Sequence, residues 1–299
     1  MDRIMFKGIM PALVTPVNED GSLRKDAAVK LIKALGETGI TGYYILGGTG
    51  EGVTIDRNTR MEFAELVKDA APKGLKIINH IAAADLSTVR MLAKHSREIG
   101  MDGLASVPPF FYNYDEAGII EYYTAMSEAS EGMPLMVYAS PLSGAPVPVG
   151  TIEKMLAIPG FVGMKYTNPN YYQMSRYKKI DGGNVNIING PDEMLALGLQ
   201  MGADGGIGST YNNMPSLYVA LYNAAQKGDF AEAIRLQHKA NDVIEIMINS
   251  GNVIGAVKLL LEMQGFDVGE TNHPMPRFSA EKKKELIAKF EQYDFLKSL

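Results

Sequence analysis

Short runs of apolar and β-branched residues alternate along the chain with longer stretches in which apolar side chains recur at helical spacing. Eight of the short runs predict buried strands, at residues 10–15, 42–46, 76–81, 103–107, 134–138, 161–166, 185–188 and 204–207. Residues 27–37 and 59–71 are typical of the amphipathic helices between them. This alternation predicts parallel strands joined by helical crossovers, and eight such units close naturally into a (β/α)8 TIM barrel. A doubly wound open sheet is the alternative.

Residues with capping preferences mark the ends of several helices. Asp56 and Ser87 are expected to be N-caps, and Gly39 and Gly100 are expected to follow helix ends, where a left-handed residue is favoured.

The pattern changes after residue 207, where only helical stretches follow, at residues 215–226, 230–249, 252–264 and 280–293. A linker rich in Pro, Gly or Ser is not found before them. We therefore expect residues 1–225 to form the barrel, as the catalytic domain, and residues 226–299 to form a C-terminal helical extension packed on it.

Composition narrows the class of protein. Of the 299 residues, 46% are hydrophobic and 21% are charged, as in an ordinary globular protein. The net charge of −5 argues against a nucleic-acid partner, because phosphate contacts need clustered Lys or Arg. Apolar runs of about 18 to 20 residues, as in a membrane span, do not occur, and Pro11 interrupts the apolar start at residues 8–14. We expect a cytoplasmic protein without a membrane partner.

Thiol and metal chemistry have little support in the sequence. The absence of cysteine excludes thiolate ligands and cysteine nucleophiles, and it fits a reducing compartment. The four histidines lack the spacing of a helical metal pair, so we expect no metal site.

The active-site groups of a barrel lie where its strands end and in the loops that follow. Strand two leads into Gly47-Gly48-Thr49-Gly50-Glu51-Gly52. These glycines allow backbone N–H groups to converge on an anion, and Thr49 adds a hydroxyl. A plain tight turn is the alternative.

Strand six contains a lysine in an apolar setting, where an ammonium group is costly to bury. Alternation places Phe161, Gly163 and Lys165 on one face. If that face lines the barrel, Gly163 leaves space and Lys165 is a candidate nucleophile for a Schiff base with a carbonyl. A lysine that extends to solvent is the alternative. Tyr138, at the end of strand five, is a candidate proton carrier or a packing residue.

The ends of strands seven and eight bring polar and small residues to the same rim. Asp192 and Glu193 are placed to accept hydrogen bonds from sugar hydroxyls, although Asp192 is equally suited to cap a helix. The stretch from Gly208 to Asn212 again combines small residues with hydroxyls.

These motifs together resemble the dihydrodipicolinate synthase / N-acetylneuraminate lyase superfamily. The resemblance rests on the segment 47–51, Tyr138 and Gly163-Met164-Lys165, and it covers nearly the whole chain. Segments 165–167, 190–194 and 208–212 look like those with which the lyase branch surrounds the sugar. The synthases usually carry an arginine in the loop after Tyr138, where this chain has Leu142 and Ser143.

The resemblance implies a class I aldolase that cleaves N-acetylneuraminate to pyruvate and N-acetylmannosamine, with no cofactor besides the lysine imine, and a homotetramer. Lys165 would form the imine and Tyr138 would move the proton, while Thr49 and the Gly48 and Thr49 N–H groups would hold the carboxylate. The residues implied to bind the sugar part are Thr167, Gly190, Asp192, Glu193, Gly208 and Ser209.

The chain also departs from the family pattern. Gly48 stands where the lyases typically have Ser or Thr. Phe111 stands where a tyrosine usually reaches into a neighbouring subunit, which leaves Tyr112 as the candidate for that role. The alternatives are therefore an aldolase or dehydratase of the superfamily acting on a 2-keto-3-deoxy sugar acid, dihydrodipicolinate synthase itself, and a non-catalytic sugar-binding relative.

Overall fold

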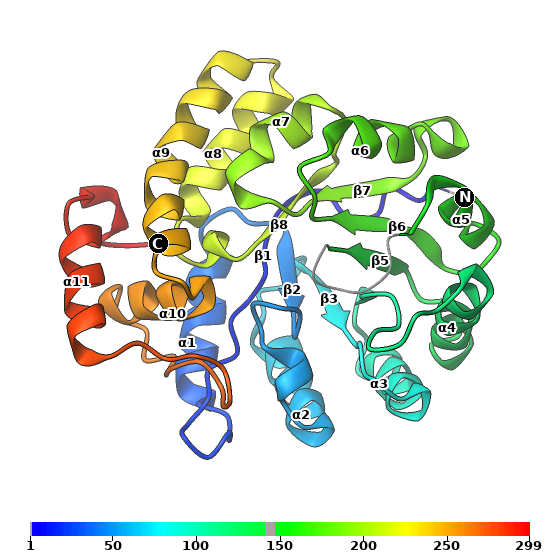
Figure 1. Cartoon of the computed structure of the whole chain (residues 1–299), viewed down its shortest axis with the longest axis horizontal. Coiled ribbons are helices and arrows are strands. Elements are labelled where there is room, and N and C mark those ends of the chain that lie inside the picture. Colours follow the sequence, from blue (N-terminus) through cyan, green and yellow to red (C-terminus); the bar gives the residue numbers. More distant parts are fainter. Residues whose placement is uncertain (1, 141–146) are drawn as a thin grey trace.

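Eight short parallel strands surround an apolar centre in the computed structural model, which describes residues 2–140 and 147–299 (Figure 1). The strands are β1 (Gly8–Pro11), β2 (Gly42–Ile45), β3 (Lys76–His80), β4 (Gly103–Ser106), β5 (Leu135–Ala139), β6 (Phe161–Tyr166), β7 (Asn186–Asn189) and β8 (Gly205–Gly208). Each pairs with the next from β2 to β8, and β8 pairs with β1. The Leu13 N–H donates to the Tyr44 carbonyl at 2.9 Å, which joins β1 to β2. The predicted (β/α)8 barrel is confirmed, and the open sheet is excluded.

Helices follow the strands in alternation and pack around them (Figure 1). The barrel helices are α1 (Lys25–Gly36), α2 (Arg57–Ala70), α3 (Leu86–Glu98), α4 (Glu116–Ala129), α5 (Val149–Met155), α6 (Tyr171–Lys178), α7 (Leu195–Gln200) and α8 (Pro215–Gln226). Their apolar faces cover the outside of the strands and leave the carboxyl ends of the strands for the connecting loops.

The predicted helix caps are confirmed with one exception. Asp56 accepts hydrogen bonds from two N–H groups at the start of α2, and Gly39 and Gly100 have φ angles of +88° and +73°. The prediction of Ser87 as an N-cap is wrong, because Asp85 precedes α3 and accepts the Thr88 N–H at 2.8 Å. Ser87 instead donates its hydroxyl to the Asp85 carboxylate.

A bulge in β6 decides which side chains face the inside of the barrel. Leu135 pairs with Phe161, but Met136 pairs with Gly163, so Val162 is an extra residue. Val162 packs inside the barrel, whereas Phe161 packs in the outer layer. The expectation that Phe161 shares a face with Lys165 is therefore wrong.

The role expected for Gly163 is also wrong. A Cβ atom at this position would stand 2.0 Å from the carbonyl oxygen of Asn186. Gly163 therefore permits the close approach of β7 and does not provide space for the lysine.

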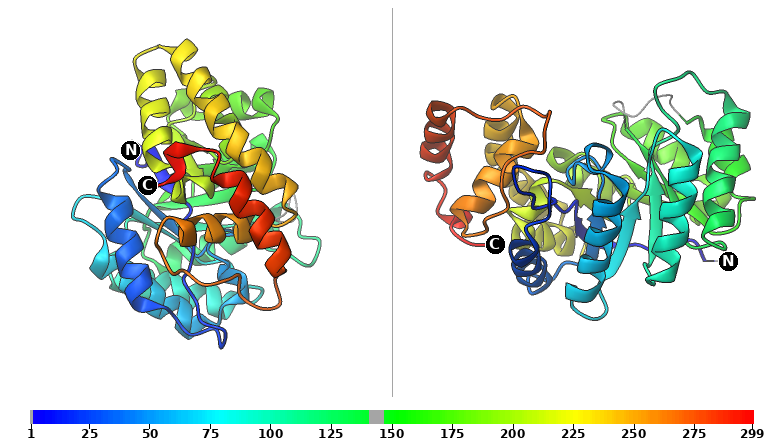
Figure 2. Two further views of the ribbon diagram at one scale, coloured as in Figure 1. Left: turned by 90° about the vertical axis from the view of Figure 1, so that its left-hand side faces the viewer. Right: turned by 90° about the horizontal axis from the view of Figure 1, so that it is seen from below.

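Three helices follow the barrel: α9 (Phe230–Asn249), α10 (Val253–Met263) and α11 (Ala280–Phe290). Figure 2 shows them together on one side of the molecule, where α9 packs against α7 and α8. The boundary proposed after residue 225 falls one residue before the end of α8. Within the described ranges, no single helix is long and apolar enough to cross a membrane; α9 and α10 meet the length and composition test only together, bent by 117°.

Candidate active site

Lys165 lies near the carboxyl end of β6 with its side chain turned into the barrel. The residue is only 5% exposed. Its Nζ atom lies 4.3 Å from the centre of the Tyr138 ring and 4.7 Å from the centre of the Tyr44 ring. Among the described residues, no carboxylate lies within ion-pair distance of this amine. Lys165 is thus a buried amine over two aromatic faces, and the alternative of a solvated lysine is excluded.

Three aromatic rings form the surroundings of the Lys165 amine. Tyr44, His80 and Tyr138 come from β2, β3 and β5, and their ring centres are 5.9–6.1 Å apart. We did not predict the places of Tyr44 and His80 from the sequence. Alternation along the second and third strands was the available signal, because every other residue of a barrel strand faces inward.

Hydrogen bonds to both ring nitrogens determine the protonation state and the tautomer of His80. Its Nδ1 lies 3.1 Å from the carbonyl oxygen of Leu46, and its Nε2 accepts the Val107 N–H at 3.3 Å. Burial, with the positive charges of Arg60 and Lys165 adding to it, lowers the pKa of His80 to about 3, although the Leu46 carbonyl opposes the shift. His80 is therefore a neutral imidazole that carries its proton on Nδ1.

The glycine-rich segment after β2 forms a tight loop beside these rings. Leu46 and Glu51 have φ angles of 58° and 55°, so left-handed residues stand at both ends of the loop. A Cβ atom at residue 47 would lie 2.4 Å from the Tyr44 ring, which explains the glycine there. In the part of the chain that the structure describes, the N–H groups of Gly48 and Thr49 have no acceptor. The loop thus offers two unpaired backbone donors to an anion.

Asp192 lies in a 3₁₀ turn (Asp192–Met194) after β7 and is buried. Its Oδ2 accepts hydrogen bonds from the Thr210 N–H and hydroxyl, both at 2.7 Å, and from the Ser209 hydroxyl at 3.3 Å. Burial raises the pKa of Asp192 to about 6, although the bonds from Thr210 oppose the shift. The alternative that Asp192 caps a helix is wrong, because its carboxylate turns to the end of β8.

Two glycines let the neighbouring polar side chains meet at this rim. A Cβ atom on Gly190 would stand 1.8 Å from Thr167 Oγ1, and a Cβ atom on Gly208 would stand 2.1 Å from Asp192 Oδ1. Thr167 Oγ1 is buried and has no hydrogen-bond partner among the described residues. A buried hydroxyl without a partner is costly, so this atom is well suited to a ligand.

Two cavities open at the carboxyl ends of the strands and share Ser140. One, of about 290 Å³, is lined by Gly47, Gly48, Val53, His80, Val107, Phe110 and Tyr138. The other, of about 530 Å³, is lined by Thr167, Gly190, Asp192, Glu193, Ser209 and neighbouring residues. The structure therefore brings the predicted carboxylate end and the predicted sugar end of the site together.

Some predicted features lie elsewhere. Tyr112 is 71% exposed and lines neither cavity, and the adjacent Phe111 is 86% exposed with a φ of +80°. Leu142 and Ser143 lie outside the described residues. Within residues 2–140 and 147–299, no three His, Asp or Glu side chains form a group that could hold a metal ion.

A barrel whose strand ends surround a buried lysine and two open cavities has the architecture of a (β/α)8-barrel enzyme. Residues 5–293 match the model of the dihydrodipicolinate synthetase family. The chain belongs to this family, as its motifs indicated.

Similar proteins define the branch of the family. The chain is 33% identical over 288 residues to the N-acetylneuraminate lyase of Citrobacter koseri, covering 96% of this chain and 97% of that protein. Its structure is similar to Proteus mirabilis N-acetylneuraminate lyase, with a TM-score of 0.91 and 29% identity over 97% and 99% of the two chains. It is also similar to the catalytic lysine mutant of Ruminococcus gnavus sialic acid aldolase, with a TM-score of 0.91 and 27% identity over 98% and 97%.

Proposed function

We propose that this protein is a class I aldolase that reversibly cleaves N-acetylneuraminate to pyruvate and N-acetylmannosamine. The observation that carries the proposal is the buried Lys165 amine, which lies over the Tyr138 and Tyr44 rings and is not held by a carboxylate among the described residues. The lyases at about a third identity support the choice of substrate.

Lys165 supplies the electron sink of the reaction. Its Nζ adds to the C2 carbonyl of the keto acid, and loss of water gives an imine. The protonated imine accepts the electron pair of the C3–C4 bond as this bond breaks. The resulting enamine takes up a proton at C3, and water then releases pyruvate and the free lysine. The imine withdraws the electrons itself, so the reaction needs no further cofactor.

Tyr138 moves the proton. The phenol gives its proton to the water that leaves during imine formation. The phenolate oxygen beside the imine then takes up the proton of the C4 hydroxyl as the C3–C4 bond breaks, and it returns this proton in the reverse direction. Tyr138 lies over the Lys165 amine, which supports this role. The neutral His80 packs behind the Tyr138 ring and holds its own proton at the Leu46 carbonyl, so it does not compete for the substrate proton.

The loop after β2 holds the carboxylate of the keto acid. The N–H groups of Gly48 and Thr49 donate to it together with the Thr49 hydroxyl. Their lack of acceptors among the described residues supports this assignment. Held at C1, the substrate presents its C2 carbonyl to the amine, which lowers the entropic cost of imine formation.

The rim formed by β6, β7 and β8 binds the polyhydroxyl part of the substrate. Asp192 and Glu193 accept hydrogen bonds from its hydroxyls. The other residues of this binding surface are Thr167, Gly190, Gly208 and Ser209. The buried, unpartnered Thr167 hydroxyl and the cavity of about 530 Å³ support the assignment.

One observation favours a second candidate, an aldolase or dehydratase that acts on a 2-keto-3-deoxy sugar acid. A Cβ atom at Gly48 would have nothing within 4 Å, so the carboxylate end is more open than a serine or threonine would leave it. Turnover of such an acid in the absence of sialic acid cleavage would favour this second candidate.

We also propose that the active form is a homotetramer. Phe111 and Tyr112 support association with a second copy, because they form an exposed aromatic pair with ring centres 5.0 Å apart, directly after Phe110, which lines the cavity of about 290 Å³. A second copy of the chain would cover the pair and receive Tyr112 near its own site. The molar mass in solution, measured by light scattering, tests this proposal, and a monomer would contradict it.

The function is tested by pyruvate release from N-acetylneuraminate. The protein is expected to release pyruvate, and Lys165→Met is expected to reduce release to background. Lys94→Met is the matched control, because Lys94 is an exposed lysine on α3. Pyruvate release by Lys165→Met at the rate of the unmodified protein would overturn the proposal.

A further inference from the structure

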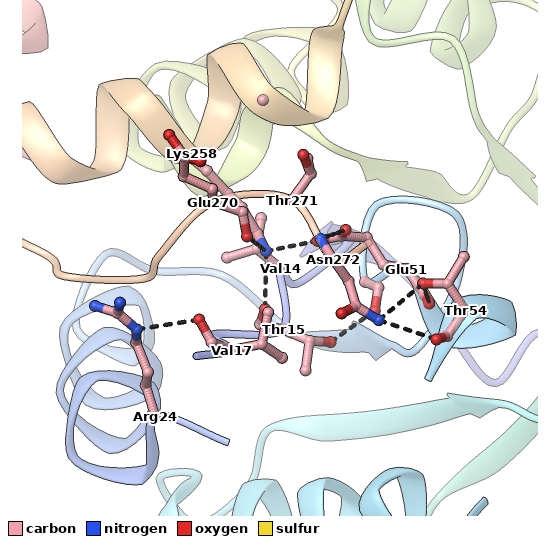
Figure 3. Close-up of polar contacts among 12 residues, drawn as sticks. Val14, Thr15, Val17, Arg24, Glu51, Thr54, Lys258, Glu270, Thr271 and Asn272 are labelled. Atoms are coloured by element: carbon pink, nitrogen blue, oxygen red, sulfur yellow. Dashed lines mark hydrogen bonds and ion pairs between the residues drawn. The ribbon is translucent and has the colours of Figure 1, made fainter. Parts of the chain in front are cut away.

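Glu51 and Lys258 form a buried ion pair between the glycine-rich loop and the C-terminal extension. Glu51 ends the loop after β2, and Lys258 lies in α10. Each residue is 2% exposed, and Lys258 Nζ lies 2.5 Å from Glu51 Oε1. Figure 3 shows the pair with its surrounding polar contacts. Two fully buried charges are unusual in a protein, because their burial costs the hydration of both groups.

The Lys258 ammonium makes two hydrogen bonds in addition to its ion pair with Glu51. It donates to the carbonyl oxygens of Thr15 at 3.0 Å and Glu270 at 2.9 Å (Figure 3). Thr15 follows β1, and its hydroxyl donates to the Gly50 carbonyl at 2.7 Å. Lys258 therefore holds the loop directly through Glu51 and indirectly through Thr15.

The second oxygen of Glu51 has its own partner. Oε2 accepts the Asn272 N–H at 2.6 Å, and the Asn272 side chain donates to the Thr54 carbonyl at 2.9 Å (Figure 3). The segment after α10 thus binds the loop just before the short 3₁₀ turn (Gly52–Thr54), at Glu51, and at the last residue of that turn, Thr54. Two elements from beyond residue 250 fix a loop that lies within the first 60 residues.

The backbone of Glu51 connects these contacts to the anion-binding donors. Glu51 has a φ of 55°, and its N–H donates to the Gly48 carbonyl at 3.0 Å, which closes the turn that begins at Gly48 and contains Thr49. A residue with a Cβ atom is strained in this conformation, so surrounding contacts must maintain it. The contacts of the Glu51 side chain therefore help to hold the backbone of Gly48 and Thr49, whose N–H groups are proposed to bind the substrate carboxylate.

We propose that Glu51 and Lys258 are positioning residues through which the C-terminal extension holds the Gly48 and Thr49 N–H groups ready for the carboxylate of the keto acid. The inference rests on the proposed function, because it needs that loop to bind the carboxylate. The extension is then part of the keto-acid site although Lys258 does not touch the substrate.

The test is the pyruvate concentration that gives half-maximal borohydride trapping of Lys165. Lys258→Met and Glu51→Gln are expected to raise this concentration at least tenfold, while the yield of adduct at saturating pyruvate is retained. If the two residues had a purely structural role, the variants would lose thermal stability, but the pyruvate concentration for half-maximal trapping would stay the same. That concentration rises only when pyruvate itself binds more weakly.

Lys178→Met is the matched control. Lys178 forms a less deeply buried ion pair with Asp204, at 2.8 Å, before the start of β8 and away from the loop. It is expected to lose stability and to leave half-saturation by pyruvate unchanged. An equal shift in Lys178→Met would overturn the inference, as would unchanged half-saturation in folded Lys258→Met.

Thr15→Val keeps the inference testable if both ion-pair variants fail to fold. This change keeps the side-chain shape and removes the hydroxyl that donates to Gly50. It is expected to raise the pyruvate concentration for half-maximal trapping about threefold or more. An unchanged concentration would overturn the inference. Failure of the unmodified protein to form any adduct would instead contradict the proposed function, so the two failures are distinguishable.

Discussion

Tyr138 and Lys165 are direct partners in the register between β5 and β6, and the lysine Nζ lies 4.3 Å from the centre of the tyrosine ring. Paired residues of adjacent parallel strands face the same side of the sheet. The bulge at Val162 lies before this pair and brings Lys165 into register with Tyr138, inside the barrel. The proposed nucleophile and the proposed proton carrier are therefore positioned by strand pairing.

Tyr138→Phe is expected to lower kcat for sialic acid cleavage by about 10² to 10⁴, because it removes the proposed proton carrier. The ring that covers the Lys165 amine stays in place, so borohydride trapping with pyruvate should remain. Steady-state kinetics and trapping on the same preparation check this. A variant with unchanged kcat would show that another group moves the proton.

Asp192→Asn is expected to raise KM for N-acetylneuraminate about 10- to 100-fold, because hydrogen bonds to a charged acceptor are each worth about 1.5–3 kcal/mol. The pyruvate concentration for half-saturation should not change, since Asp192 lines the cavity proposed for the sugar part. In the unmodified protein, KM should also rise as the pH falls through about 6, where Asp192 takes up a proton. Loss of pyruvate binding in the variant would argue against this division of the site.

The same substitution is expected to change stability with a defined pH dependence. The pKa of Asp192 is about 6 in the folded protein and 3.8 in its ordinary state, so the ionised carboxyl opposes folding at pH 8 by roughly 3 kcal/mol. Asp192→Asn should therefore raise the free energy of unfolding at pH 8 and have little effect near pH 4. Denaturant unfolding at the two pH values measures this, and a loss of stability at pH 8 would contradict it.

His80 is expected to stay neutral with its proton on Nδ1 down to about pH 4. Its pKa is lowered to about 3 from 6.5, so its contribution to stability is complete above pH 6.5 and is lost as the pH falls toward 3. Imidazole ¹⁵N chemical shifts followed from pH 8 to pH 4 report the tautomer directly. A titration centred near pH 6.5 would contradict the burial and hydrogen bonds described for this ring.

Gly48→Ser is expected to fold normally and to bind pyruvate several-fold more tightly, because a Cβ atom at this position has nothing within 4 Å and the hydroxyl adds a donor near the carboxylate. Gly52→Ser is the control, since its Cβ atom would stand 1.9 Å from the Leu46 carbonyl oxygen. The control should be strongly destabilised. A comparable loss of thermal stability in both variants would show that the loop tolerates no side chain at residue 48.

The barrel could be predicted from the sequence because each strand is a short apolar run and each crossover has a helical period, and β6 begins and ends at the predicted residues. The face of Phe161 could not be predicted, because the extra residue at Val162 breaks the alternation and depends on pairing with β5. Ser87 was chosen as a cap on residue type, whereas Asp85 offers a carboxylate at the start of α3.

The place of the candidate site could be predicted where one unusual residue marks it, as does the lysine within an apolar strand, which the structure shows to be buried. The Glu51 and Lys258 pair was not predicted, because its members are more than 200 residues apart and meet only through tertiary packing. A single lysine within the apolar helix α10 was the only local signal. The contact of Thr210 with Asp192 was not predicted for the same reason, since these hydrogen bonds join the ends of two strands.

Borohydride reduction in the presence of pyruvate, followed by mass spectrometry of the digested protein, shows whether Lys165 forms an imine. We expect one reduced pyruvate adduct per chain, located on Lys165, and no adduct in Lys165→Met. An unmodified Lys165 at saturating pyruvate, or an adduct on another lysine that persists in Lys165→Met, would contradict it.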